Sequence, residues 1–102
     1  MQTMLFIGGE WRPASDGGTF PVLDPATEKS ITEVSNATAE DVTSAVHVAY
    51  TAGKDWAKKL PRERAEVLRN AFNLLTECKQ EIAELMTLEN GKALEDSLSE
   101  AA

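Results

Sequence analysis

Apolar residues recur at steps of three and four along residues 62–90, and this pattern restricts the fold more than any other feature of the chain. The period predicts one amphipathic helix of about eight turns, with an apolar face and charged residues on the remaining faces. Gly91 follows the pattern and supplies the left-handed conformation that ends many helices. The apolar positions are Leu68, Phe72, Leu75, Cys78, Ile82, Leu85 and Met86.

A second helix is predicted from Thr38 to about Trp56. The Thr38 hydroxyl can accept a hydrogen bond from a free amide at the helix start, and Asp41, three residues on, can reciprocate. Leu60-Pro61 interrupts the pattern and restarts it, because proline is tolerated at the first helical position. Small side chains on one face allow a neighbouring backbone to approach closely. That face consists of Val42, Ala45, Val46, Ala49, Ala52 and Gly53.

The first 34 residues have strand character and predict two hairpins. Residues 4–7 and 10–12 flank Gly8-Gly9, a connection that tolerates the positive φ angles of a tight turn. A turn at residues 15–18 then leads into the second pair. This pair consists of residues 19–23 and 30–34, with the turn residues Asp24-Pro25-Ala26-Thr27 between them.

Residues 92–102 begin another amphipathic helix. Leu94 and Leu98 stand at i and i+4, so they form an apolar stripe that needs a partner surface. No Gly, Asn or Pro follows to end the helix. We therefore expect these 102 residues to be the opening part of a longer protein.

Composition excludes several classes of partner. With 10 basic and 17 acidic residues the net charge is −7, which disfavours nucleic acid and anionic membrane surfaces. No apolar run approaches the length of a membrane span, and no basic leader precedes an apolar segment. Cys78 is the only cysteine, which excludes an intrachain disulfide and fits a reducing, cytoplasmic setting.

The residues themselves offer little chemistry. There is no phosphate-binding glycine loop, no G-x-G-x-x-G, no H-E-x-x-H and no cysteine pair. His47, the only histidine, has no carboxylate or cysteine at a ligand-like spacing, so we interpret it as a surface residue. Cys78 falls on the apolar stripe, which favours an inert, packed thiol over a nucleophile.

Four segments, in this order and spacing, resemble the start of an NAD(P)-dependent aldehyde dehydrogenase. The similarity covers essentially the whole chain, and residues 69–75 with residues 85–92 most resemble the succinate-semialdehyde dehydrogenase branch. The segments are FIGGEW at residues 6–11, FPVLDPATEKSITEV at 20–34, RAEVLRNAFNLL at 64–75 and LMTLENGK at 85–92.

The resemblance implies a fold and a role. The full-length family has an α/β fold, and this segment alone is expected to be an N-terminal β-hairpin region (residues 1–37) followed by a helical region (residues 38–102). The helical region comprises two long helices and the start of a third. Both regions are expected to belong to the cofactor-binding domain and to pack on a nucleotide-binding sheet formed by later residues. In such enzymes a cysteine thiolate attacks the aldehyde, hydride passes to nicotinamide, and water hydrolyses the thioester.

The resemblance also implies where the functional groups lie. The catalytic cysteine, its glutamate base, the oxyanion-stabilising asparagine and the residues that grip the nucleotide lie downstream of Ala102, so no catalytic or cofactor-binding residue is expected here. The full-length enzyme is expected to use NAD or NADP, a choice the segment leaves open, and to be a homo-oligomer. Many family members share a monovalent cation site built from backbone carbonyls, which corresponds here to Val22 or Leu23. These two residues also fit an ordinary strand with one face buried.

Two functional interpretations therefore stand. In the first, the chain is the leading piece of an aldehyde dehydrogenase, structural in role and inactive by itself, with the remainder of that chain as its partner. In the second, it is a small acidic interaction module or remnant that binds another chain through the stripe of Leu94 and Leu98. The abrupt ending favours the first, because an independent module is expected to close its apolar surface.

Overall fold

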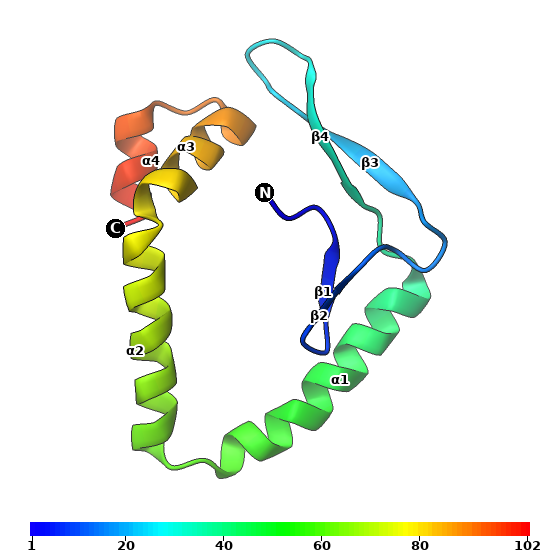
Figure 1. Cartoon of the computed structure of the whole chain (residues 1–102), viewed down its shortest axis with the longest axis vertical. Helices are drawn as coiled ribbons and strands as arrows, with labels where there is room; N and C mark the ends of the chain where they lie inside the picture. Colours follow the sequence, from blue (N-terminus) through cyan, green and yellow to red (C-terminus); the bar gives the residue numbers. More distant parts are fainter. The chain divides into compact units, whose positions relative to one another are not determined.

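A computed structural model describes residues 1–102 as two β-hairpins followed by four helices (Figure 1). This confirms the predicted order of a hairpin region and a helical region. The strands are β1 (Leu5–Ile7), β2 (Glu10–Arg12), β3 (Thr19–Leu23) and β4 (Ser30–Ser35). The helices are α1 (Ala39–Lys58), α2 (Pro61–Glu77), α3 (Lys79–Asn90) and α4 (Leu94–Glu100).

The chain divides into two compact units. The first unit is Met1–Val22 with Thr32–Lys59, and the second is Leu23–Ile31 with Leu60–Ala102. Ala14 in the first unit and Ala83 in the second are the buried hydrophobic residues, so neither unit encloses large apolar side chains. No helix combines the length and the apolar character needed to cross a lipid bilayer.

The first unit contains the β1–β2 hairpin. The two strands are antiparallel, with Phe6 paired to Trp11, and Gly8 and Gly9 turn the chain with φ angles of 65° and 86°. Those positive angles are why the predicted Gly-Gly connection forms a tight turn. The rings of Phe6 and Trp11 lie 4.8 Å apart between centroids, as cross-strand aromatic pairs do.

The hairpin packs on the small-residue face of α1. Its turn and the helix line a shallow groove, and a β-carbon at Gly8 would lie 3.8 Å from a Val48 methyl. This confirms that small side chains on α1 admit a neighbouring backbone. The groove is lined by Phe6, Ile7, Gly8, Gly9, Ala45, Val48, Ala49 and Ala52.

The second hairpin has the predicted turn between β3 and β4. One Asp24 carboxylate oxygen accepts from the Ala26 amide at 2.8 Å, and the other accepts from the Thr27 hydroxyl at 2.9 Å. Glu28 takes a left-handed φ of 58°, and its amide bonds back to the Asp24 carbonyl. Aspartate suits this position because its side chain caps the turn.

The long helix predicted over residues 62–90 is instead two helices, which corrects the sequence interpretation. Cys78 separates α2 from α3 with φ −93° and ψ 7°, outside the helical region. Its carbonyl nevertheless accepts from the Ile82 amide at 3.0 Å, so the hydrogen-bond ladder resumes at once. The apolar period survives a one-residue bend, which is why the pattern did not reveal it.

α4 turns back after α3 and packs on it within the second unit. Gly91 ends α3 with φ 71°, as predicted, and its amide bonds to the Thr87 carbonyl. Ser97 is fully buried, and its hydroxyl shares a 2.9 Å hydrogen bond with that of Thr87. Leu94 remains 40% exposed, so Ser97 rather than the predicted leucine stripe supplies the most buried position of α4.

Candidate functional site

The only histidine and the only cysteine of the chain, His47 and Cys78, lie on different elements and in different compact units. His47 is exposed on α1, as predicted. Cys78 is also exposed, at the α2–α3 junction, so the prediction of a packed thiol is wrong. No group of three or more His, Cys, Asp or Glu side chains is placed to hold a metal ion.

Val22 and Leu23 lie next to each other near the end of β3. Successive residues of a strand direct their carbonyl oxygens to opposite edges, so the two carbonyls do not converge on one ion. At most one of these two carbonyl oxygens can therefore be the predicted backbone ligand of the cation. The cation site stays a prediction that depends on ligands from elsewhere.

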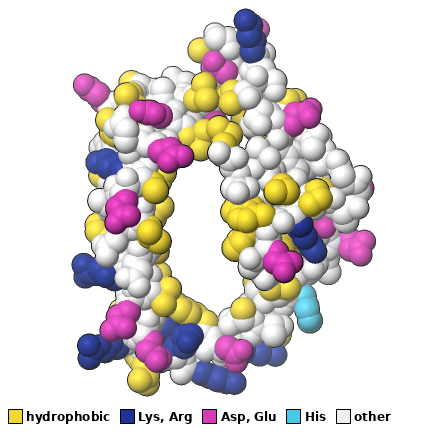
Figure 2. Space-filling view, in the orientation of Figure 1, with side chains coloured by type: hydrophobic (Ala, Val, Ile, Leu, Met, Phe, Trp, Pro, Cys, Tyr) yellow, Lys and Arg dark blue, Asp and Glu magenta, His cyan; other side chains and the backbone are white.

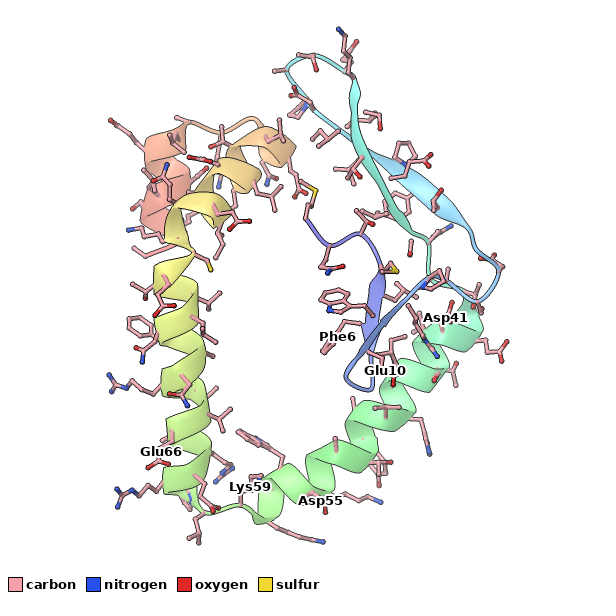
Figure 3. The ribbon with its side chains drawn as sticks, viewed as in Figure 1. Phe6, Glu10, Asp41, Asp55, Lys59 and Glu66 are labelled. Atoms are coloured by element: carbon pink, nitrogen blue, oxygen red, sulfur yellow. The ribbon has the colours of Figure 1, made fainter.

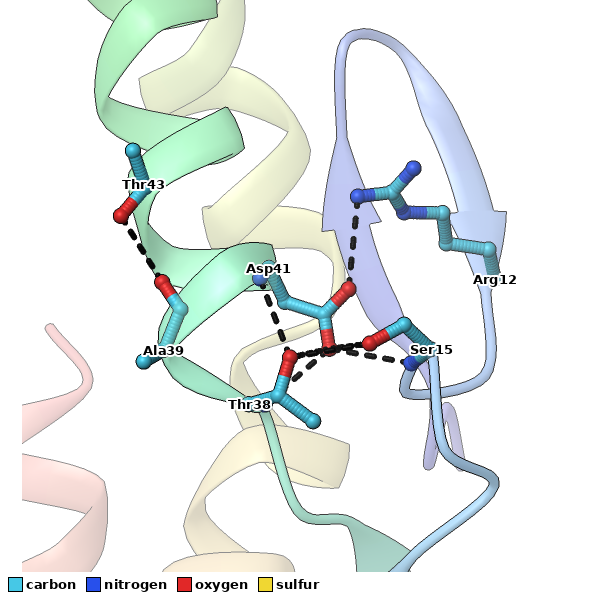
Figure 4. A network of polar contacts seen from close by, with 6 residues as sticks. All are labelled: Arg12, Ser15, Thr38, Ala39, Asp41 and Thr43. Atoms are coloured by element: carbon cyan, nitrogen blue, oxygen red, sulfur yellow. Dashed lines mark hydrogen bonds and ion pairs between the residues drawn. The ribbon is translucent and has the colours of Figure 1, made fainter.

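The most developed polar site is a network centred on Asp41, at the start of α1 (Figure 4). Asp41 is only 3% exposed. One carboxylate oxygen accepts from the backbone amides of Ser15 and Thr38, both at 3.0 Å. The same oxygen accepts from the hydroxyls of Thr38 at 3.0 Å and Ser15 at 3.2 Å. Four donors thus converge on one oxygen.

Arg12 completes the network from the end of β2. Its guanidinium lies 3.6 Å from the second Asp41 oxygen, which gives the carboxylate an ion pair as well as hydrogen bonds. The Thr38 hydroxyl accepts from the Asp41 amide at 3.2 Å, which closes the predicted reciprocal cap. The hairpin and the helix start are therefore joined by a single carboxylate.

Hydrogen bonding lowers the pKa of Asp41 from 3.8 to about 2. The largest cause is the backbone amide of Ser15, followed by that of Thr38, and burial opposes them. A carboxylate this stable in its charged form is a poor general base at neutral pH. We therefore interpret Asp41 as a structural anchor for the hairpin.

Sequence reasoning found Thr38 and Asp41 but missed Arg12 and Ser15. The cap was visible because its two members stand three residues apart. Ser15 stands 26 residues from Asp41, and no local period links such positions. The turn residues around Ser15 gave the only signal, and they indicated a loop.

Large apolar side chains remain exposed along α2. Leu68 is 65% exposed, and Phe72 and Leu75 are each 58% exposed. Hydrophobic groups are visible along this helix in the space-filling view (Figure 2). Soluble monomers rarely expose so much contiguous apolar surface without a partner for it.

The charged side of α2 is different. The Arg62 guanidinium pairs with Glu66 at 3.3 Å one turn later, and Glu66 projects from the helix into solvent (Figure 3). A similar pair, Asp55 and Lys58 at 3.8 Å, lies near the end of α1. These exposed pairs are ordinary solvated helix surface and form no binding site.

Comparison with known proteins gives the family. Residues 11–102 match the model of the aldehyde dehydrogenase family. The mitochondrial succinate-semialdehyde dehydrogenase of Hylobates lar is 35% identical over 100 residues, which is 98% of this chain and 18% of that protein.

Two solved structures agree over nearly the whole chain. A 3,6-anhydro-L-galactose dehydrogenase is 42% identical with a TM-score of 0.92, over 99% of this chain and 21% of that one. A betaine aldehyde dehydrogenase from Staphylococcus aureus, in complex with NAD+, is 27% identical with a TM-score of 0.94, over 98% and 20% of the two chains. The chain thus spans about a fifth of the length of these relatives. With the hairpins, the capped helix and the family match in agreement, the chain belongs to the aldehyde dehydrogenase family.

Proposed function

We propose that this chain forms the N-terminal part of the cofactor-binding domain of an NAD(P)-dependent aldehyde dehydrogenase, with a structural role. The observation that carries the proposal is the match in fold to a solved dehydrogenase over 99% of the chain at a TM-score of 0.92. The hairpin region (residues 1–37) and the helical region (residues 38–102) are its two parts. The remainder of the dehydrogenase chain is its partner.

The chemistry of the whole enzyme follows from the family and lies outside this segment. A nicotinamide cofactor, NAD or NADP, accepts hydride as the aldehyde becomes a carboxylic acid. The resemblance to the family implies that the reacting groups lie in later residues, and the one thiol of this chain, Cys78, is exposed at a helix junction. Their contribution is to fix the hairpin on α1 through Asp41 and to present apolar helix surface.

The substrate we propose is succinate semialdehyde. The support is the 35% identity to a succinate-semialdehyde dehydrogenase over 98% of this chain. We propose further that the whole enzyme is a homo-oligomer in a reducing, cytoplasmic setting. It is expected to bind neither nucleic acid nor membranes. The net charge of −7 supports the exclusion of polyanions.

A chimera tests the structural role. The segment of the 42% identical 3,6-anhydro-L-galactose dehydrogenase that aligns with this chain is replaced by residues 1–102. We expect a soluble enzyme that still reduces its nicotinamide cofactor with 3,6-anhydro-L-galactose as substrate. A host that is soluble and active with its own segment but inactive with this one would contradict the proposal.

The substrate is tested separately, on the polypeptide encoded by the complete reading frame that contains these residues. We expect kcat/KM for succinate semialdehyde to exceed that for betaine aldehyde, with either NAD or NADP. Equal or reversed kcat/KM values would exclude succinate semialdehyde as the proposed substrate and would leave the proposed structural role of this segment unaffected.

A further inference from the structure

The end of α3 combines a reactive pair of residues with a helix cap. Asn90 is the last residue of the helix, and Gly91 follows it as the cap. We infer that Asn90 is a site of spontaneous deamidation, and that opening of the last turn of α3 controls the rate of this reaction. The inference goes beyond the proposed function, because the reaction needs neither substrate nor cofactor.

Deamidation at an asparagine–glycine pair needs no enzyme. The backbone nitrogen of Gly91 attacks the side-chain carbon Cγ of Asn90, the bond between Cγ and Nδ2 breaks, and ammonia leaves with the proton of the Gly91 amide. Water then opens the cyclic imide at one of its two carbonyls. The product is either aspartate or isoaspartate, in which the main chain runs through Cβ and Cγ. Glycine favours the attack because no β-carbon hinders its nitrogen.

Asn90 is the one asparagine of the chain that glycine follows. Asn36 and Asn70 precede alanine, and Asn73 precedes leucine. Asn90 and Gly91 are both exposed, so water reaches the reacting groups. Of the asparagines in this chain, Asn90 therefore has the fastest expected reaction.

The fold favours glycine at position 91 and so retains the reactive pair. Gly91 has a left-handed φ of 71°, and a β-carbon there would lie 2.9 Å from Cγ of Pro25. A larger residue would slow the attack, but it would be strained in this conformation and would collide with the proline ring. The reactivity of the pair is thus a consequence of the residue that ends α3.

The same cap restrains the reaction in the folded chain. The Gly91 amide donates a 2.9 Å hydrogen bond to the Thr87 carbonyl, which holds the attacking nitrogen and its proton in the helical ladder. The Thr87 hydroxyl shares a 2.9 Å hydrogen bond with the buried Ser97 of α4, which lies beside α3 (Figure 1). Helix ends open more readily than helix centres, and the open state frees the Gly91 nitrogen for the attack.

Either product weakens the cap. The C-terminal end of a helix carries partial negative charge, so it repels a new carboxylate at position 90. The last turn of α3 has no basic residue, and the Lys92 ammonium is paired with Glu100. Isoaspartate also lengthens the main chain before Gly91 and displaces the capping amide. The last turn of α3 is therefore expected to open more often after the reaction.

Peptide mapping by mass spectrometry tests the inference on the polypeptide encoded by the complete reading frame that contains these residues. After incubation in mildly alkaline buffer, we expect the peptide with Asn90 to gain the mass of deamidation, while Asn36, Asn70 and Asn73 keep their amides. Asn90→Gln supplies the blank. An Asn90 amide as stable as those of the other three asparagines would overturn the inference. The measurement reads mass rather than activity, so neither result bears on the proposed function.

Two variants test control by the last turn of α3. Ser97→Ala removes one partner of the Thr87–Ser97 hydrogen bond and should speed deamidation of Asn90 about fivefold, the effect of one lost hydrogen bond on the open population. Thr76→Ala should leave the rate unchanged, because the Thr76 hydroxyl bonds to the Phe72 carbonyl within α2.

Deamidation in urea supplies a reference that does not depend on whether a variant folds. Urea unfolds α3, so all forms should react there at one common rate, faster than the native wild type. A native wild-type rate equal to the rate in urea would overturn the inference. A native Ser97→Ala rate no higher than that of Thr76→Ala would overturn it as well.

Discussion

The backbone amide of Ser15 donates a 3.0 Å hydrogen bond to the carboxylate of Asp41, which joins two positions 26 residues apart. Through this bond the loop after β2 is fixed to the first turn of α1. Arg12 and Thr38 contact the same carboxylate, so one side chain links the end of β2, the loop after it and the start of α1.

The pH dependence of hairpin docking follows from Asp41. Its pKa falls from 3.8 to about 2 in the folded chain, so the stabilising effect is complete above pH 3.8 and is lost as the pH falls toward 2. We expect Trp11 fluorescence to change over that window in the native chain. Asp41→Asn should lack this transition, whereas Asp55→Asn, on an exposed pair with Lys58, should keep it. A transition that persists in Asp41→Asn would show that another group controls docking.

Loss of the α1 cap should destabilise the chain. Thr38→Ala removes the hydroxyl that accepts from the Asp41 amide, at a cost of about 1 kcal/mol in the free energy of unfolding. Thr38→Ser should recover most of it. Thr43→Ala is the control, because the Thr43 hydroxyl bonds only to the Ala39 carbonyl inside the helix (Figure 4). Urea unfolding followed by circular dichroism measures all three, and equal effects at positions 38 and 43 would contradict the cap.

Two glycines should respond with opposite signs. Gly91 has φ 71°, and a β-carbon there would lie 2.9 Å from Pro25 Cγ. Gly91→Ala should therefore destabilise the chain by roughly 1–2 kcal/mol. Gly53 lies inside α1 with open space around it, so Gly53→Ala should stabilise by about 1 kcal/mol. Thermal melts of both variants check the pair, and a stabilising Gly91→Ala would show that the left-handed turn is not required.

The exposed thiol gives a chemical test of the bend. Because Cys78 is exposed at the α2–α3 junction, one equivalent of thiol should react with Ellman's reagent in the native chain as completely as in urea. A continuous helix with a packed thiol would instead leave Cys78 protected until unfolding. Cys78→Ser should remove the signal and supplies the blank.

The isolated chain should be catalytically inactive. Incubation with succinate semialdehyde and either NAD or NADP should give no reduced nicotinamide by absorbance, because the family's nucleophile, base and nucleotide-binding residues are expected downstream of Ala102. A mock purification is the control for contaminating dehydrogenases. Turnover above that control would overturn the assignment of the reacting groups to later residues.

Local rules in the sequence determined much of the fold. The Gly8-Gly9 turn, the Thr38 cap, the restart at Pro61 and the stop at Gly91 each depend on residues a few positions apart, and each is present in the structure. A backbone conformation that only certain residues adopt, or a cap within one helical turn, can be identified without knowing any distant contact.

Tertiary structure decided the rest. The bend at Cys78 leaves the apolar period intact, and the partners of Asp41 and the burial of Ser97 depend on residues distant in sequence. The sequence by itself identified α2 as amphipathic, whereas only the structure revealed that its own unit leaves Leu68 and Phe72 exposed. Periodicity reports which face of a helix is apolar, but what covers that face depends on contacts between segments far apart along the chain.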